Sequence, residues 1–246
     1  MSDEFERIFQ VSEKRLARLA YTVWDIIKHP KSVNFYNLGS SFRFSYDLHT
    51  TLFGEPNNEI LERYNPKGEI SLSFDLKWLQ LVKDYFSHFK VMDKSAENQD
   101  MNKFLCMELA ESNFISKDTC ESQKISENTA ELLSFKQRML YSNSDGGGVI
   151  ITKNGKIIAV AFAPHIIKNE RFSFAIIRGV WVSKEHRNKG YGYDVSTKIC
   201  QELFLKNIDK ITLWVEETNI PAVKIYEKMG FKTMDKVFGT DCIKNN

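Results

Sequence analysis

The sequence predicts an α+β (α/β-like) fold, in which a mixed and mostly antiparallel twisted sheet is flanked by helices. Apolar runs in the C-terminal half alternate between strand and helix periods, in the order helix, hairpin, strand, glycine loop, helix, strand, helix, strand. Within that series, Asn154-Gly155 is a strong signal for a two-residue turn, which makes the first two strands antiparallel. A smaller α/β lobe is expected to precede this half.

The smaller lobe is assigned to residues 1–112. Apolar residues between Phe5 and Ile26 recur every three or four positions, which predicts one helix. His29-Pro30 ends it, because proline disfavours helix in the residue before it. Aromatic and polar residues alternate at 42–46, which is typical of a strand. A strand–helix–strand unit is then expected at residues 70–74, 78–89 and 104–109.

The larger domain is assigned to residues 113–246. Leu132, Phe135 and Met139 lie at helical spacing and predict the helix that precedes the hairpin. The remaining strands are expected at residues 149–153, 156–167, 172–183, 211–217 and 231–242, and the remaining helices at 195–203 and 222–229.

Composition excludes several classes of protein. The 246 residues are 42% apolar and 27% charged, as in ordinary globular proteins rather than disordered or fibrous ones. The net charge of +2 offers no concentrated basic surface, so a nucleic-acid partner is not expected. No apolar run reaches the roughly 18 residues of a membrane span or forms a signal peptide, so no membrane association is expected.

The cysteines give no signal for metal or dithiol chemistry. They are Cys106, Cys120, Cys200 and Cys242, and no two have the short spacing of a zinc knuckle or a redox pair. We therefore expect free thiols, no metal and a cytoplasmic, reducing location.

A glycine loop is the sharpest chemical feature of the sequence. A strand ending near Val182 leads into the basic segment Arg187-Asn188-Lys189-Gly190-Tyr191-Gly192, and a helix follows. The first amides of a helix have no intrahelical partner, and the helix dipole adds partial positive charge there. Glycines let the backbone approach a ligand closely. Such a turn is suited to a phosphate or pyrophosphate, although a tight strand-to-helix turn alone is the alternative.

Two common phosphate-binding motifs fit poorly. A dinucleotide-binding turn requires a third glycine where Val195 stands, although Glu216 or Glu217 lies near the expected acidic position. Too few residues follow the loop for a doubly wound sheet, so a nicotinamide- or nucleotide-binding protein is only a third alternative. No G-K-[ST] follows the glycines, which excludes a P-loop.

Two segments carry a family resemblance. Residues 187–192 resemble the R/Q-x-x-G-x-G/A signature of the GNAT superfamily of acetyl-CoA-dependent N-acyltransferases. Residues 215–231 resemble its second signature, V-x-x-x-N-x-x-A-x-x-x-Y-x-x-x-G-F, in the expected order and at the expected distance. The resemblance covers about residues 121–246. The first lobe is similar only in architecture to the preceding lobe of glycine-N-acyltransferase-like members.

The resemblance implies an acyl-CoA N-acyltransferase fold with acetyl-CoA as co-substrate. The strand at 172–183 would splay away from that at 211–217, leaving backbone groups that pair with pantetheine, while the loop amides hold the pyrophosphate. Tyr226 would protonate the departing thiolate, although packing is the alternative role for it, and capping is the alternative for Asn219. The implied cofactor-binding residues are Val180, Trp181, Val182, Arg187, Asn188, Lys189, Gly190, Tyr191, Gly192, Tyr193 and Asn219.

One expected element is missing from the sequence. Many family members carry a carboxylate general base on the strand before the glycine loop, but residues 172–179 contain none. Glu216, His165, Glu185, a water relay or bulk solvent are the alternatives.

The predicted function is therefore transfer of an acetyl group from acetyl-CoA to a primary amine. The alternative is a non-catalytic acyl-CoA-binding or sensor module. The lobe at 1–112 is expected to serve the acceptor side or to be structural. The motifs encode neither the acceptor, a small molecule or a peptide or protein, nor the acyl length or the oligomeric state.

Overall fold

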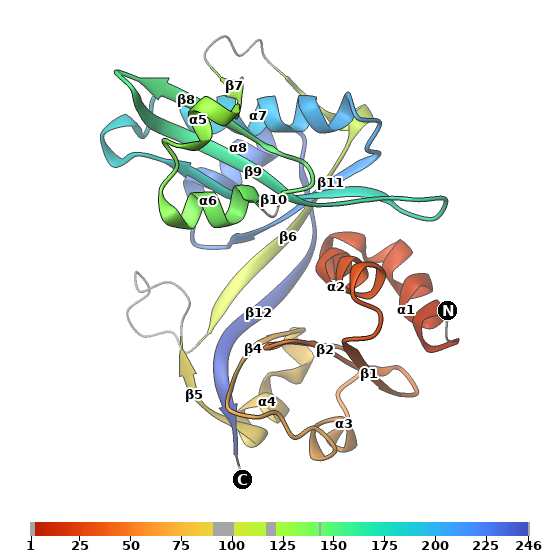
Figure 1. Cartoon of the computed structure of the whole chain (residues 1–246). Helices are drawn as coiled ribbons and strands as arrows, with labels where there is room; N and C mark the ends of the chain where they lie inside the picture. The colour runs from red at the N-terminus through yellow and green to blue at the C-terminus, as the bar shows by residue number, and fades with distance from the viewer. Residues whose placement is uncertain (1–2, 91–100, 117–121, 143, 246) are drawn as a thin grey trace. The chain divides into compact units, whose positions relative to one another are not determined.

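The computed structural model describes residues 3–90, 101–116, 122–142 and 144–245. They form two compact units (Figure 1). Unit 1 contains Met1–Cys106, Glu216–Thr218 and Met234–Asn246, and unit 2 contains Met107–Val215 and Asn219–Thr233. The units are therefore not two successive segments, because strands β6 (Asn102–Ala110) and β12 (Lys232–Lys244) contribute residues to both.

Unit 1 is built on a mixed sheet with the order β1-β2-β3-β4-β12, and β5 pairs with β12. Neighbouring strands are antiparallel except β3 and β4, which are parallel. Its other elements are α1 (Asp3–Lys14), α2 (Leu16–Lys28), β1 (Val33–Leu38), β2 (Ser41–Tyr46), β3 (His49–Gly54), α3 (Asn58–Glu62), β4 (Glu69–Phe74), α4 (Leu79–Tyr85) and β5 (Phe86–Lys90).

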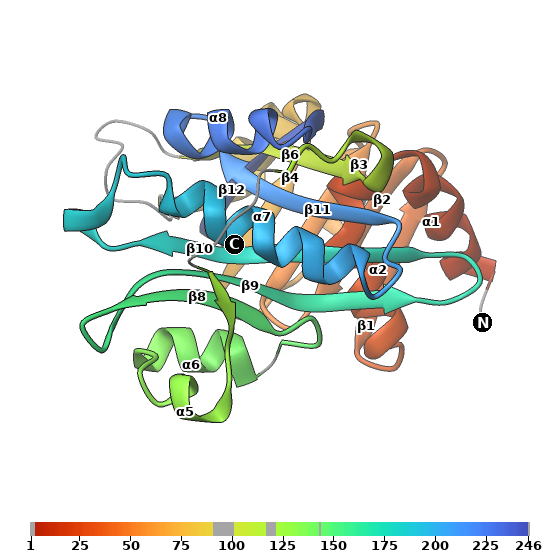
Figure 2. The same cartoon turned by 90° about the horizontal axis from the view of Figure 1, so that it is seen from above.

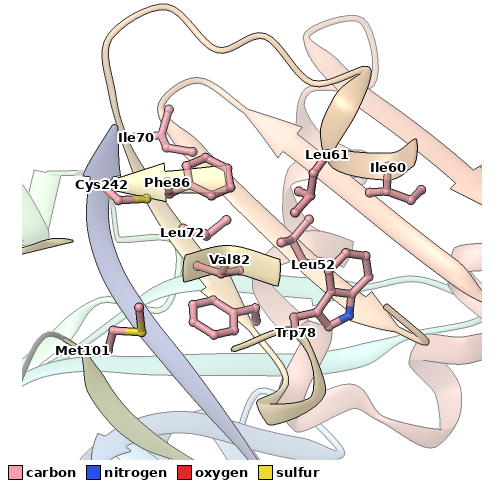
Figure 3. Packing of buried hydrophobic residues seen from close by; sticks show 11 residues of the cluster. Leu52, Ile60, Leu61, Ile70, Leu72, Trp78, Val82, Phe86, Met101 and Cys242 are labelled. Atoms are coloured by element: carbon pink, nitrogen blue, oxygen red, sulfur yellow. The ribbon is translucent and has the colours of Figure 1, made fainter. Parts of the chain in front are cut away.

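A buried apolar cluster stabilises unit 1 (Figure 3). Trp78 and Val82 of the 78–85 region pack with Leu52 of β3, and all three side chains are fully buried. The Trp78 indole Nε1 donates a hydrogen bond to the Gly54 carbonyl at 3.0 Å, so its polar atom is satisfied. The buried Arg18 pairs with Asp75 at 3.2 Å, which compensates its charge within the unit.

The single N-terminal helix predicted by the apolar periodicity is wrong. Arg15 leaves the helical conformation, with φ −129° and ψ 39°, and separates α1 from α2. Ser12 Oγ donates to the Ile8 carbonyl at 2.8 Å, a hydrogen bond of the type that often bends a helix. The predicted stop at His29-Pro30 is confirmed, since α2 ends at Lys28 with His29 as its C-cap.

The helix predicted over 78–89 is too long. It ends at Tyr85, and Phe86–Lys90 forms β5, with His88 at φ +55°. Phe86 and Ser87 pair with Lys244 and Ile243 of β12. Because this pairing is tertiary, local aromatic spacing did not reveal it. The strand expected at 42–46 is β2, and two unpredicted strands, β1 and β3, flank it.

Unit 2 is a mixed sheet in which β11, β10, β9, β8 and β7 are neighbours in that order. The pair β10–β11 is parallel, and the pairs among β7 to β10 are antiparallel. Figure 2 shows α7 running along the sheet beside β10; α7 contacts β8, β9 and β10, and α6 contacts β9. Its elements besides β6 are β7 (Gln123–Lys124), α5 (Glu127–Ala130), α6 (Phe135–Ser142), β8 (Gly148–Lys153), β9 (Lys156–Lys168), β10 (Ser173–Val182), α7 (Tyr191–Phe204), β11 (Lys210–Glu216) and α8 (Ile220–Lys228).

The predicted fold class is confirmed, as a mixed, mostly antiparallel sheet flanked by helices. The predicted hairpin is also present: Asn154 and Gly155 have φ values of +51° and +70° and join β8 to β9. Two residues with positive φ form the turn whose twist suits an antiparallel pair.

Replacing Asp25 with Asn should change how the stability of unit 1 depends on pH. Burial raises the pKa of the Asp25 carboxyl to about 7, above its ordinary value near 3.8. The folded state therefore holds a proton that the unfolded state has lost, so this group lowers stability as the pH rises from about 4 to 7. We expect D25N to be more stable than the parent at pH 8, by up to about 4 kcal/mol, and therefore to melt at a higher temperature there, with little difference at pH 4.

Thermal melts at both pH values measure this difference. The exposed turn residue Asp47 supplies the control, and D47N should follow the parent at each pH. A D25N variant whose advantage is the same at pH 4 and pH 8 contradicts the assignment.

Candidate functional site

Strand β10 separates from β11 part of the way along its length. The two strands are paired at Phe174–Lys210, Ala175–Ile211 and Ile176–Thr212, and no later pair joins them in the described part of the chain. Both strands nevertheless continue, β10 to Val182 and β11 to Glu216. The backbone of residues 177–182 thus has an edge that β11 does not cover, and an extended ligand can pair with it.

A β-bulge accompanies this separation. Between Arg178 and Trp181, three steps along β10 match two steps along β9, from Phe162 to Val160. Gly179 lies inside the bulge with φ +68°, and an added Cβ would stand 2.8 Å from Leu140 Cδ1. The position therefore requires glycine both for its conformation and for its space. Gly179 is not among the predicted site residues, although an isolated glycine within a strand pattern is a signal for a bulge.

The loop after β10 is held by its own side chains. Ser183 Oγ and His186 Nδ1 lie 2.7 Å apart, Arg187 Nε donates to the Val182 carbonyl at 3.3 Å, and Lys189 Nζ donates to the Glu185 carbonyl at 3.1 Å. Asn188 adopts a left-handed conformation with φ +59°. The segment thus combines an ordered turn with basic side chains directly before a helix of 14 residues.

The two loop glycines meet different constraints. Gly190 is the N-cap of α7 with φ +89°, and a Cβ there would meet nothing within 4 Å. Gly192 lies in the first turn, where a Cβ would come within 3.2 Å of Ile225 Cδ1 and 3.5 Å of Val182 Cγ2. Gly190 therefore sets the backbone path and leaves open space above it, whereas Gly192 lets α7 pack closely on β10 and α8.

The two tyrosines of the loop motif point inward. Tyr191 and Tyr193 are each less than a tenth exposed, and Lys153 Nζ lies 4.7 Å from the Tyr191 ring. The Tyr193 hydroxyl donates to the Ile115 carbonyl at 3.3 Å. Only the backbone of these residues is available to a ligand at the start of α7.

The predicted acid, Tyr226, is buried on α8. Its side chain is 6% exposed and meets the Phe231 ring edge-on at 5.6 Å. Burial, and then the nearby Cys200 thiol of α7, raise the pKa of the Tyr226 phenol well above its ordinary value. The phenol therefore keeps its proton at any working pH, as a proton donor must, and its packing contacts are compatible with that role.

Asn219 is the N-cap of α8. Its Oδ1 accepts from the Ala222 amide at 3.4 Å, and Pro221 follows in the first turn. The capping role that the sequence left open is therefore present, while a contact between Asn219 and a cofactor stays a prediction.

The three candidate bases lie in different surroundings. Glu216 accepts from Asn102 Nδ2 at 2.6 Å, and both residues belong to unit 1. His165 lies on β9 opposite Ile176, the last residue of β10 that pairs with β11. Glu185 is exposed in the loop. Strand β10 carries no carboxylate along Ser173–Val182, so the structure brings no acid onto the separated strand itself.

Two other kinds of site are absent from the described residues. No group of three or more His, Cys, Asp or Glu side chains is arranged to hold a metal within the described ranges. None of the helices seen there has the length and apolar character needed to cross a membrane. Cys106, Cys200 and Cys242 are free and buried, and Cys120 lies outside the described residues.

Comparison with known proteins identifies relatives of this chain. Residues 108–231 match the sequence profile of the acetyltransferase (GNAT) family. Mycothiol acetyltransferase from Corynebacterium aurimucosum is 34% identical over 64 residues, which cover 26% of this chain and 21% of that protein. The chain thus matches about one fifth of the length of that curated relative.

Solved structures share the fold. A GCN5-related N-acetyltransferase-like protein from Streptococcus suis aligns with a TM-score of 0.60 at 14% identity, covering 96% of this chain and all of that one. A GCN5-related N-acetyltransferase from Kribbella flavida aligns with a TM-score of 0.57 at 12% identity, covering 95% and 94%. At these identities, the similarity shows the fold alone.

Replacing Gly190 with Leu should weaken binding of coenzyme A about tenfold or more while the protein stays folded. A side chain there projects into open space over the loop and shifts a backbone with φ +89°, which costs on the order of 1 kcal/mol. Isothermal titration of G190L with coenzyme A, together with a thermal melt, measures both effects.

Gly155 provides the matched control. It also has a positive φ, +70°, with nothing within 4 Å of an added Cβ, but it lies in the β8–β9 turn. The G155L variant should lose similar stability and keep its affinity. Equal affinities of G190L and the parent would remove the pyrophosphate from this loop.

Proposed function

Because this chain belongs to the acetyltransferase (GNAT) family, we propose that it transfers an acetyl group from acetyl-CoA to a primary amine. The observation that supports this most is the separation of β10 from β11 directly before an anion-binding helix start. A long, thin ligand with a diphosphate at one end needs both features in this order. Acetyl-CoA has that shape.

The donor is held by the backbone more than by side chains. Amides of Asn188–Tyr193 at the start of α7 bind the diphosphate, and Arg187 and Lys189 add positive charge at the rim. The backbone groups of Val180–Val182, on the uncovered edge of β10, pair with the amides of the pantetheine arm. Asn219 contacts the arm from the start of α8.

The reaction is a direct attack on the thioester. The lone pair of a neutral amine forms a bond to the carbonyl carbon, and a backbone N–H of Val180–Val182 stabilises the negative oxygen. The carbon–sulfur bond then breaks, the nitrogen loses one proton, and the thiolate gains one. The products are the N-acetylated amine and coenzyme A, so atoms and charge balance.

Tyr226 supplies the proton to the thiolate. Its phenol stays protonated because burial raises its pKa, and it lies on α8, the helix that follows β11. Once the thiol leaves, the tyrosinate is reprotonated by the proton released from the nitrogen, either directly or through solvent.

Removal of the amine proton has several candidate routes. His165 and Glu185 lie in unit 2, Glu216 lies in unit 1, and a water relay or bulk solvent needs no side chain. The lack of a carboxylate on β10 is also the one observation that favours the second candidate function, an acyl-CoA-binding module without turnover.

Titration of the purified protein with acetyl-CoA, followed by thiol-release assays over an amine panel, tests the proposal. We expect binding in the micromolar range and release of coenzyme A that depends on an amine. The same titration with NAD should give no heat, because the loop lacks the third glycine of a dinucleotide site.

The other two possible results of this experiment lead to different conclusions. Binding without release over the whole panel favours the acyl-CoA-binding module. Absence of acetyl-CoA binding contradicts both functions.

Replacing Tyr226 with Phe should lower kcat by about 100-fold or more and leave the KM for acetyl-CoA unchanged, since general acids typically contribute that much. The phenyl ring keeps the packing against Phe231, so the fold should persist. Steady-state kinetics with the best amine measure the change. Tyr141, whose hydroxyl donates to the Ile125 carbonyl on the α6 side of unit 2, is the control, and Y141F should retain full activity.

The pH profile of kcat/KM gives a second test of Tyr226. The rate should rise with pH through the pKa of the acceptor amine, because only the neutral amine attacks. No falling limb should appear below about pH 10, since the raised pKa keeps the phenol protonated there. A falling limb near pH 8 that disappears in Y226F would show instead a donor with a lowered pKa.

A further inference from the structure

Arg178 occupies an unusual position on β10. It lies two residues beyond Ile176, where pairing with β11 ends, and at the start of the bulge. The residue is exposed, and no side-chain hydrogen bond or ion pair joins its guanidinium to another residue in the described part of the chain. By contrast, Arg187 and Lys189 of the neighbouring loop donate to carbonyl groups of their own segment.

The direction of the donor brings its acyl end toward this residue. With the diphosphate at residues 188–193 and the pantetheine arm along Val182 to Val180, the thioester lies further back along β10. Val182 and Arg178 are four residues apart, which is at most about 13 Å in a fully extended strand, and the bulge between them shortens this distance. Arg178 therefore lies two residues beyond Val180, at the end of the backbone stretch to which the thioester would extend.

The permanent positive charge of Arg178 favours some classes of amine acceptor over others, according to the charge that the acceptor carries. It repels an ammonium group, which disfavours acceptors such as polyamines that carry several positive charges and no negative one. It attracts a carboxylate, which a guanidinium can bind through two parallel hydrogen bonds. No carboxylate on β10 offsets this charge.

We propose that Arg178 binds the carboxylate of the acceptor, so that the acceptor is a small amine that carries a carboxylate, of the amino-acid type. This inference rests on the proposed acetyl transfer and names its substrate class. Pairing the carboxylate with Arg178 orients the amine toward the thioester. The same charge favours the neutral amine over the ammonium, which lessens the need for a carboxylate base on the strand.

Matched acceptors test the proposal directly. Thiol release from acetyl-CoA is measured for a panel of free amino acids and for the C-terminal amide of each, which keeps the amine and side chain but removes the negative charge. We expect kcat/KM to be about ten- to a hundredfold higher for the best free acid than for its amide, as one charge-assisted interaction provides.

Variants of Arg178 show whether this residue causes the preference. In R178Q the advantage of the acid over the amide should disappear, mainly through a higher KM for the acid. In R178K part of the advantage should return, because the charge is kept while the paired geometry is lost. Arg171, near the other end of β10 and stacked on Phe172, is the control, and R171Q should keep the parent's preference.

The readouts separate failure of this inference from failure of the proposed function. If acetyl-CoA binds but amides, polyamines or lysine-containing peptides are acetylated as well as or better than free amino acids, the inference is wrong and the transferase stands. The same holds if R178Q keeps the acid preference, or if other amines are acetylated while no amino acid is. If the parent protein does not bind acetyl-CoA, the proposed function itself fails. R178Q should bind acetyl-CoA as tightly as the parent, because Arg178 is not needed for the donor, and this separates loss of acceptor preference from loss of donor binding.

Discussion

The separation of β10 from β11 after Ile176 is the constraint on which the rest of the site depends. Parallel strands that stay paired leave no free backbone groups between them, and a ligand can then bind only at the strand ends. Here pairing with β11 ends at Ile176, whereas β9 pairs with the other edge of β10 as far as Val182, with register shifts on both sides of Arg178. An extended binding edge and the start of α7 are thereby placed one after the other along the same few residues.

Three glycines make this arrangement possible, each for a different reason. Gly179 adopts a left-handed conformation where Leu140 of α6 leaves no room for a side chain. Gly190 adopts the left-handed conformation at the N-cap of α7. Gly192 allows close packing against Val182. Only Gly190 has open space above it. Gly179 and Gly192 are needed for packing inside unit 2, whereas Gly190 is the glycine that a ligand can approach.

Sequence patterns predicted the elements whose signals are local. The Asn154-Gly155 turn and the strand–loop–helix around Gly190 depend on residues next to one another, and both are present. The patterns failed where pairing with a strand distant in sequence determines the secondary structure. Phe86–Lys90 forms a strand because β12 pairs with it. They also did not place the bulge: Gly179 within the strand run was a signal for one, but only the register against β9 shows where the extra residue lies.

The surroundings of Tyr226 bear on how a weak acid can protonate a thiolate. An ordinary phenol, with a pKa of about 10, is a poor donor to a thiolate whose acid has a pKa of about 8.5, and burial weakens this donor further. Burial acts on thiols in the same direction, and it raises the pKa of the neighbouring Cys200 thiol. A thiolate released beside Tyr226 would meet the same apolar surroundings and become a stronger base. Because burial raises the pKa of a phenol and of a thiol alike, it need not enlarge the difference between the two groups, and a buried tyrosine can still serve as the acid.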